Sequence, residues 1–291
     1  MTNEPRYPIA FSRGNARVDD LRTWVGLTGA SALLFGPLRW AILASGRLGR
    51  RHLLHRLERI WATVMTRALG IRVTVSGLDR VDADQEYVVV PLHEGLVDPL
   101  VITRIPLHLS FAARDELFDW RFLGSYLSAS EQTSISTRSG PDGFRALLRG
   151  AQAAFDRNES FVVFPQGSIL GVEAAFFPGP FRVAEKLGRP ILPVVISGTH
   201  RVWEYPYRPI VRRHQRVRLE ILDPIPADRS VESMRSTERE MKRIALSRAP
   251  FPRRYEPDRD GWWDEYPFRI DGDFARLAHR VRDHRSSAGV G

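Results

Sequence analysis

A histidine and an aspartate stand close together where a run of apolar residues ends. The run VVVPL covers residues 88–92, His93 follows it, and Asp98 stands five positions further on, before Pro99. In α/β folds, a histidine at the carboxyl end of a strand lies at the edge of a crevice, and a carboxylate one turn later can accept its ring N–H. Such a pair leaves the other ring nitrogen free to act as a general base. On its own the spacing is common, and most random instances are a capping aspartate beside an incidental histidine.

Three further segments also lie at predicted strand ends. In SISTRSGPDGFR (134–145), Arg138 follows a strand and precedes a helix N-terminus, a position suited to anion binding. The segment VVFPQGSIL (162–170) is a buried strand that ends in a glycine-containing turn, where backbone N–H groups can approach a ligand closely. In RPILPVVISG (189–198), Pro193 interrupts a strand, which predicts an edge strand or a bend.

The four segments, in this order, resemble the glycerolipid acyltransferase family, whose best-known type is lysophosphatidic acid acyltransferase. That family shows an H-x4-D block, an arginine-bearing block, an F-P-E-G-T-R block and a V-P-V block at similar intervals, and the likeness covers roughly residues 70–200. The resemblance implies that His93 is the general base and that Asp98 orients it. The acceptor hydroxyl would attack the thioester of acyl-CoA, or of acyl-carrier protein, directly, and Arg138 would bind the acceptor phosphate.

The third block is expected to line the substrate site. By the resemblance, Gln166, Gly167 and Ser168 bind substrate, and backbone N–H groups near Gly167 and Ser168 are candidates to stabilise the oxyanion. No acyl-enzyme is required, in agreement with a sequence that has 0 cysteines and no G-x-S-x-G motif.

Three positions depart from the family pattern. Gln166 stands in place of glutamate, Ile169 in place of arginine, and Phe177 in place of a basic residue. A charge-assisted hydrogen bond in a phosphate cradle is typically worth about 1.5–3 kcal/mol, so the loss of two cations, at Ile169 and Phe177, would weaken phosphate binding. Either Arg182 or Arg201 replaces the missing cations, or the acceptor differs from a simple glycerol phosphate. The second interpretation is favoured, with a larger lysophospholipid, a glycolipid sugar hydroxyl or another lipid alcohol as the acceptor.

Two other functions are compatible with these residues. A non-catalytic lipid-binding relative would explain the altered third block, but it has no reason to retain both His93 and Asp98. An acyl-CoA or acyl-lipid hydrolase would use the same base, with water as the acceptor. No third ligand lies near this pair in the sequence, so no metal site is predicted. We expect no cofactor, with acyl-CoA as co-substrate.

The net charge of +9 predicts an anionic partner. The arginines are scattered and form no recognised nucleic-acid-binding motif, so no nucleic acid is expected. The lack of cysteine excludes disulfides and thiolate metal sites. The expected partners are acyl-CoA, a lipid acceptor and an anionic membrane surface, and the sequence leaves the oligomeric state open.

The apolar N-terminal stretch predicts membrane association. Residues 24–38 carry no charge and residues 40–46 are apolar, but Pro37 and Arg39 lie within the roughly 20 residues needed to span a bilayer. The stretch is typical of an interfacial or re-entrant segment at the cytoplasmic face of the cell membrane, in a peripheral or monotopic protein. The alternative is a helical hairpin packed on the protein's own core. The arginines that would meet anionic headgroups are Arg47, Arg50, Arg51, Arg56 and Arg59.

Strand-like and helix-like segments alternate after residue 70. Strands are predicted at 71–77, 86–92, 108–113, 133–136, 160–165, 190–197 and 215–222, and helices at 98–104, 115–128, 141–156, 179–188 and 229–248. This order predicts an α/β fold with a mixed, mostly parallel central sheet flanked by helices. The predicted segments are a disordered N-terminus (1–20), an N-terminal helical, membrane-associated segment (21–69), an acyltransferase domain (70–248) and a C-terminal irregular wrap with a short helix (249–291).

Overall fold

The computed structural model describes residues 17–18, 25–26, 28–29, 32–120, 123–136, 140–169, 171–202, 210–248, 269–274 and 279. Most of the N-terminus predicted to be disordered (1–20) and most of the predicted C-terminal wrap (249–291) therefore lie outside the described residues.

Within the described residues, seven strands form one sheet in the order β2-β9-β7-β3-β6-β4-β5. Their bounds are β2 (Arg72–Ser76), β3 (Val88–Pro91), β4 (Leu109–Arg114), β5 (Thr133–Ile135), β6 (Ser160–Val162), β7 (Ile191–Ser197) and β9 (Arg216–Ile221). Neighbouring strands run parallel except β7 and β9, which are antiparallel. The predicted mixed, mostly parallel sheet is confirmed. Two-residue strands, β1 (Arg17–Val18) and β8 (Ile210–Val211), form a separate parallel pair.

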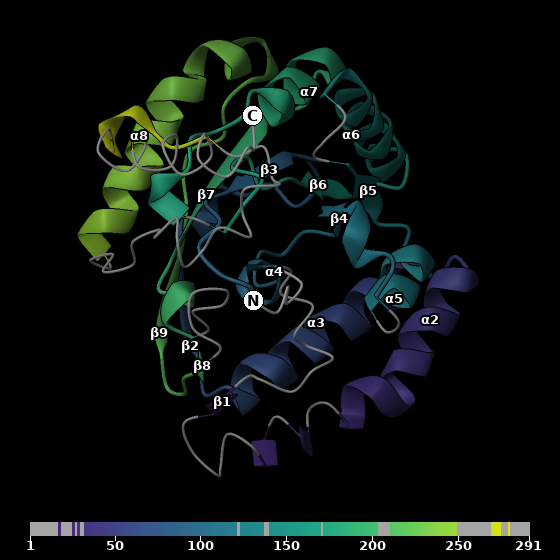
Figure 1. Cartoon of the computed structure of the whole chain (residues 1–291). Coiled ribbons are helices and arrows are strands. Elements are labelled where there is room, and N and C mark those ends of the chain that lie inside the picture. The colour runs from purple at the N-terminus through teal and green to yellow at the C-terminus, as the bar shows by residue number, and fades with distance from the viewer. Residues whose placement is uncertain are drawn as a thin grey trace, which may run out of the picture.

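Helices cover both faces of the sheet (Figure 1). The helix bounds are α2 (Arg39–Arg47), α3 (Arg51–Ala68), α4 (Asp98–Ile102), α5 (Leu123–Ala129), α6 (Gly140–Phe155), α7 (Gly179–Leu187) and α8 (Ser230–Arg248). Side chains of α3 and α4 pack into the core on one face, and those of α6, α7 and α8 into the core on the other. Short 3-10 turns lie at Leu78–Arg80, Asp115–Leu117, Gly171–Glu173, Thr199–Arg201, Ala227–Arg229 and Gly272–Phe274.

Strand β3 shows how this layering follows from the sequence. Val88 and Val90 contribute to the core beneath α6, α7 and α8, whereas Val89 contributes to the core beneath α3 and α4, and all three are 0% exposed. A strand buried on both faces needs apolar side chains at every position, not at alternate ones. The continuous run VVVPL therefore marks a central strand, and the chemistry that follows it emerges from the middle of the sheet.

The structure corrects two predictions of local structure. Pro193 predicted an edge strand or a bend, but β7 lies inside the sheet between β9 and β3. The proline is tolerated because it precedes the first β7–β9 pair, Val194 with Ile221, and its carbonyl still accepts the N–H of Leu222 at 3.0 Å. The single helix predicted at 115–128 is instead a 3-10 turn, Asp115–Leu117, followed by α5.

Part of the N-terminal hairpin formed by α2 and α3 packs on the domain. Leu38, Ile42 and Leu54 form a buried cluster. A Cβ atom on Gly46 would lie 2.0 Å from the carbonyl oxygen of Ala129, so α2 approaches the end of α5 main chain to main chain. Other large apolar side chains of the hairpin are exposed, namely Trp40, Leu48, Leu53 and Ile60. Among the described residues, no helix is long and apolar enough to cross a bilayer.

A buried ionic network ties α3 to the amino end of β6. Nδ1 of His55 lies 3.0 Å from Oε2 of Glu58, and its Nε2 lies 2.8 Å from Oε1 of Glu159. Arg51 donates to Glu159 at 2.7 Å, and the hydroxyl of Tyr126 donates to Glu58 at 2.7 Å. Arg51 was predicted to meet lipid headgroups; that prediction is wrong, because its guanidinium is directed into the domain.

The network sets the charge of its members. Burial alone would lower the pKa of His55, but hydrogen bonds from its ring to Glu159 and Glu58 raise it above the usual value of 6.5. The same hydrogen bond helps to lower the pKa of Glu159 despite the opposing effect of burial. Burial and the neighbouring positive charge of His55 lower the pKa of His108 to about 4. Both ring nitrogens of His55 thus face carboxylates, an arrangement that favours its charged form, and the ring of His108 stacks on it.

Candidate active site

The turn after β3 brings His93 and Asp98 together. Nδ1 of His93 lies 2.7 Å from Oδ2 of Asp98, which begins α4. The Asp98 side chain is 0% exposed and that of His93 is 16% exposed. Because an ionised carboxylate only accepts hydrogen bonds, Nδ1 carries the hydrogen and Nε2 carries the lone pair. Nε2 has no hydrogen-bond partner among the described residues, so it is free to take a proton from a substrate.

Asp98 also holds the turn that carries the histidine. Its Oδ2 atom accepts the backbone N–H of Glu94 at 2.7 Å and that of Gly95 at 3.0 Å. Asp98 does not act as a helix cap, because its carboxylate folds back onto the preceding turn and makes no cap bond to α4. The role of His93 as a general base remains a prediction. One buried carboxylate thus fixes both the backbone of the turn and the direction of the imidazole ring.

The third block supports His93 from the other side. The ring of Phe164 stacks on the imidazole with centroids 3.9 Å apart. Oε1 of Gln166 accepts the His93 N–H at 2.7 Å, and Nε2 of Gln166 donates to the carbonyl of Gly171. The N–H of Gly171 in turn donates to the His93 carbonyl at 3.0 Å. Gln166 is 0% exposed, so its amide closes a ring of hydrogen bonds between the first and third blocks.

Gly167, the residue after Gln166, makes the turn that the sequence predicted. Gly167 adopts φ +64°, a conformation that favours glycine, and the Phe177 ring lies 3.6 Å from the place of a Cβ atom. Ser168 is 3% exposed, and its Oγ has no hydrogen-bond partner in the described part of the chain. Ile169 is buried as well. Substrate binding by Gln166, Gly167 and Ser168 remains a prediction, and Arg138 lies outside the described residues.

Two contacts near the site were missed from the sequence. Glu94, the neighbour of His93, is 0% exposed and lies with Oε2 3.0 Å from Nδ1 of His200. An acidic residue directly beside a candidate base was the available signal, but its partner lies 106 positions away. In the sequence, His200 is distinguished from the other histidines only by its nearness to the fourth block.

The second missed contact comes from the C-terminal part of the chain. Residues 269–274 lie along the loop that follows the third block: the carbonyl of Arg269 accepts the Ala175 N–H at 2.7 Å, and the Asp271 N–H donates to the Glu173 carbonyl at 2.8 Å. The Asp271 carboxylate is also bound by Lys242 of α8. This segment therefore braces the loop that contains Gly171.

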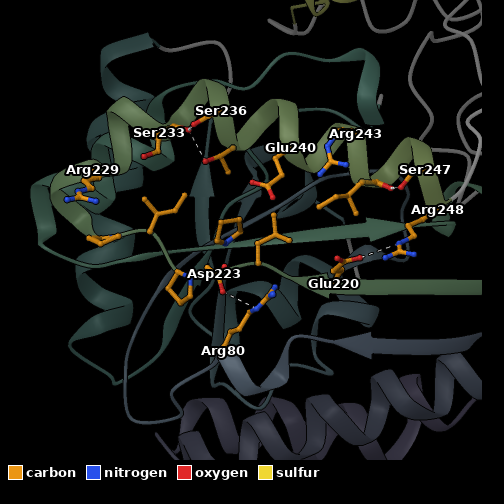
Figure 2. A pocket seen from close by; sticks show the side chains of 17 residues that line it. Arg80, Glu220, Asp223, Arg229, Ser233, Ser236, Glu240, Arg243, Ser247 and Arg248 are labelled. Carbon is orange, nitrogen blue, oxygen red and sulfur yellow. Dashed lines mark hydrogen bonds and ion pairs between the residues drawn. The ribbon is translucent and has the colours of Figure 1, made fainter.

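A groove of about 590 Å³ lies between α8 and β9, and Figure 2 shows its lining. Arg80 and Asp223 form an ion pair at 3.0 Å on one wall, and Glu240 and Arg243 of α8 line the other. The lining does not include the residues around His93, so the groove is separate from the candidate site. In the described part of the chain, no three His, Asp or Glu side chains are grouped as metal ligands would be.

Comparison with known proteins shows what this chain is similar to. The family model described as Acyltransferase matches residues 72–197, which include the His93–Asp98 pair. The 1-acyl-sn-glycerol-3-phosphate acyltransferase of Saccharomyces cerevisiae is 27% identical over 158 residues, 52% of this chain and 52% of that protein. The protein of the same name from Cocos nucifera is 26% identical over 138 residues, 46% of this chain and 44% of that protein. The chain thus spans about half the length of the curated relatives it matches.

A solved structure shares the fold. The crystal structure of the 1-acyl-sn-glycerophosphate (LPA) acyltransferase PlsC from Thermotoga maritima matches with a TM-score of 0.63 at 22% sequence identity, covering 81% of this chain and 97% of that one. The match confirms the predicted arrangement of a mostly parallel sheet between helices. Over residues 72–197 this chain is therefore similar to the Acyltransferase family model, it is similar in sequence to the named 1-acyl-sn-glycerol-3-phosphate acyltransferases over about half its length, and it shares its fold with the PlsC structure.

Proposed function

We propose that this chain is a membrane-surface O-acyltransferase. It moves a fatty acyl group from acyl-CoA, or from acyl-carrier protein, to a hydroxyl of a lysophospholipid or a related lipid acceptor. The observation that carries the proposal is the His93–Asp98 pair, with Nδ1 2.7 Å from Oδ2 and Nε2 free to accept a proton, inside the segment that the Acyltransferase family model matches.

In the proposed reaction, Nε2 of His93 takes the proton of the acceptor hydroxyl while the hydroxyl oxygen attacks the thioester carbonyl carbon. The C–O bond forms, and the tetrahedral oxyanion then collapses with cleavage of the C–S bond. The leaving thiolate takes the proton from His93, so the products are an ester and a free thiol. The buried carboxylate of Asp98 stabilises the imidazolium between these steps. This route uses no metal and no cofactor, with acyl-CoA as co-substrate.

The third block would then serve two purposes. Gln166 is a positioning residue in this proposal, because it is fully buried and both ends of its amide bind backbone. Gly167 and Ser168, which follow it, remain the candidates to stabilise the oxyanion. The positive φ of Gly167 turns the chain at this point, which supports a role for the backbone and not for a charged side chain.

The identity of the acceptor depends on whether cationic side chains near the third block can bind a phosphate group. In the described part of the third block, Gln166 and the buried Ile169 carry no charge, and the later position Phe177 is aromatic. This supports an acceptor other than a simple glycerol phosphate, although the named relatives are 1-acyl-sn-glycerol-3-phosphate acyltransferases. The arginines left as candidates to bind an acceptor phosphate are Arg138, Arg182 and Arg201.

The membrane surface is the proposed place of the reaction, at the cytoplasmic face. Support comes from the α2–α3 hairpin, where Trp40 is 62% exposed and Leu48 is 68% exposed. The same hairpin also carries exposed arginines, namely Arg47, Arg50 and Arg56. A surface with exposed apolar anchors and cations suits an anionic lipid interface.

The test is release of free thiol from palmitoyl-CoA by the purified protein in detergent. It is run without an acceptor and then with lysophosphatidic acid, lysophosphatidylcholine or a lysoglycolipid. We expect release that depends on one acceptor and that falls at least about 10²-fold in His93→Ala, since a general base typically contributes that much. His279→Ala is a control for loss of a histidine elsewhere.

Three results would contradict the proposal. Thiol release that is the same with and without every acceptor would indicate a hydrolase. Near-native turnover by His93→Ala, with product formed, would remove His93 from the chemistry. Release that is absent with all donors and acceptors, in a protein that binds the lipids, would indicate a non-catalytic lipid-binding relative.

A further inference from the structure

A second buried pair of carboxylate and histidine lies beside the first. Glu94 is 0% exposed and His200 is 1% exposed. Oε2 of Glu94 lies 3.0 Å from Nδ1 of His200 and accepts the N–H of Gly198 at 2.8 Å. Since a carboxylate only accepts, Nδ1 of His200 carries the hydrogen. The segment HEGLVD thus places two acidic side chains on two different histidines, one of which is the candidate base.

The contacts of Glu94 join the two turns that follow the carboxyl ends of β3 and β7. Strands β3 and β7 are parallel neighbours, with Pro91 opposite Val194, so the turns that follow them emerge side by side. Gly198 adopts φ +98°, which lets the chain turn at the end of β7. A Cβ atom on Gly95 would lie 3.0 Å from the carbonyl carbon and oxygen of Thr199. The two turns therefore pack main chain against main chain.

We propose that Glu94 and His200 are positioning residues for acyl transfer, which act by fixing the main chain next to His93. The inference rests on the proposed function, because it concerns the same general base. Asp98 holds the ring of His93 and Gln166 holds its N–H. The side chain of Glu94 fixes its own main chain, directly after His93, against the turn that follows β7.

Removal of the Glu94 carboxylate would leave the Gly198 N–H and the ring N–H of His200 without this acceptor in a buried region, which is unfavourable. The two turns would then separate or shift until other partners satisfy these groups. A displacement of a catalytic group by about 1 Å can cost on the order of 10²-fold in rate, because the reacting atoms no longer meet in line. Substrate affinity depends on other contacts and would change little.

The experiment compares two truncations with two conservative variants. Glu94→Ala and His200→Ala remove the pair. Glu94→Gln keeps an oxygen that can accept the Gly198 N–H, and His200→Asn keeps an N–H near the position of Nδ1. His55→Ala is the matched control, because it breaks another buried pair of histidine and carboxylate. That pair lies at the amino end of β6, away from the carboxyl ends of the strands where His93 lies.

Two readouts are taken for each variant that folds: kcat and KM for palmitoyl-CoA with the preferred acceptor, and amide hydrogen exchange of residues 92–98. We expect Glu94→Ala and His200→Ala to lower kcat at least about 10-fold with KM nearly unchanged, and the conservative variants to recover most of the rate. Exchange across 92–98 should become faster in the two truncations. His55→Ala should lower Tm but leave kcat and this exchange as in the wild type.

Three results would overturn the inference. Wild-type kcat in a folded Glu94→Ala protein is the first, and a kcat loss in His55→Ala equal to that in Glu94→Ala is the second, since both would show no specific positioning. The third result applies if Glu94→Ala does not fold. It is wild-type kcat, together with wild-type hydrogen exchange, in both conservative variants and in His200→Ala. Failure of the proposed function is distinct, because His93→Ala would then match the wild type in thiol release, while hydrogen exchange would still test the anchoring of the turn.

Discussion

The amide of Gln166 gives a sharp test of the hydrogen-bond ring that supports His93. Its oxygen accepts the His93 N–H and its nitrogen donates to the Gly171 carbonyl, and the whole side chain is buried. Gln166→Glu preserves the shape and the accepting oxygen but replaces the donor with a second oxygen. When ionised, the introduced carboxylate faces the Gly171 carbonyl oxygen, and both atoms only accept.

The magnitude depends on pH. When protonated, the introduced carboxyl can donate to the Gly171 carbonyl as the amide does, so we expect stability close to that of the wild type at low pH. Burial and the facing carbonyl oxygen raise the folded-state pKa of the introduced group above the unfolded value of about 4.3. Stability is then retained below about pH 4.3 and falls by about 1.4 kcal/mol for each pH unit up to the folded-state pKa. At pH 7.5, about 3.2 pH units above the unfolded value, the expected loss reaches at most about 4.4 kcal/mol, when the folded-state pKa lies at or above that pH.

The assay is the thermal midpoint of the purified protein in detergent between pH 5 and pH 8, as a difference from the wild type at each pH. A domain of this size loses about 2–4 °C of Tm for each kcal/mol. Gln166→Met is the matched control: it has a similar shape but neither bond, so it leaves the His93 N–H and the Gly171 carbonyl unpaired at every pH and its deficit should be constant.

A Tm deficit of Gln166→Glu that is the same at pH 5 and pH 8 would refute this reasoning. So would the absence of any deficit at pH 8, because a buried carboxylate opposite a carbonyl oxygen must then have found a donor that the structure does not show. Thiol release by the same samples gives a second reading, since a weakened ring should also lower kcat through displacement of His93.

Replacement of Asp98 by asparagine keeps an accepting oxygen but removes the charge that stabilises the imidazolium of His93. Asp98→Asn should therefore lower kcat about 10²–10⁴-fold in the thiol-release assay. A loss below tenfold would contradict the proposal that Asp98 orients His93. Because the folded-state pKa of His55 is raised, its protonated ring stabilises the folded protein fully below the unfolded pKa of 6.5, and this contribution is lost as pH rises through the folded-state pKa. The Tm of the wild type should therefore fall over that pH range. His55→Asn should lack this loss, and parallel Tm profiles of the two proteins would contradict it. Serine in place of the exposed Trp40 and Leu48 should reduce sedimentation with anionic vesicles at unchanged Tm, and full sedimentation would place the anchor elsewhere.

The strands and helices of the sheet could be predicted because their sequences carry their own signals. Continuous apolar runs mark the strands that are buried on both faces, such as β3, and charged amphipathic stretches mark helices such as α8. The order of the strands could not be predicted, since it depends on which apolar faces meet in space. Pro193 shows the difference: a residue that weakens a strand in isolation is acceptable inside a sheet where no partner requires its N–H.

The contacts of the candidate site could likewise be predicted only where the two residues are close in sequence. His93 and Asp98 are close in sequence, so their spacing, together with the resemblance over four segments, predicted the pair, and the structure brings their side chains to 2.7 Å. The hydrogen bond between Gln166 and His93 spans 73 positions, and no local pattern indicates that a glutamine will bind distant backbone. The partner of Glu94 was hidden for the same reason. Tertiary contacts of this kind depend on the register of β3, β6 and β7, which single-sequence patterns do not specify.

Residues 269–274 can cover the loop after the third block only after many further residues have been synthesised, since Arg269 follows its partner Phe176 by 93 positions. The sheet, whose last strand ends at Ile221, is complete in sequence well before that. Closing so long a loop carries an entropy cost, and contacts between distant segments form late. We therefore expect a newly made chain to pass through a stage in which the sheet has formed while the loop beside His93 is still unbraced. The reaction centre would mature last during biogenesis.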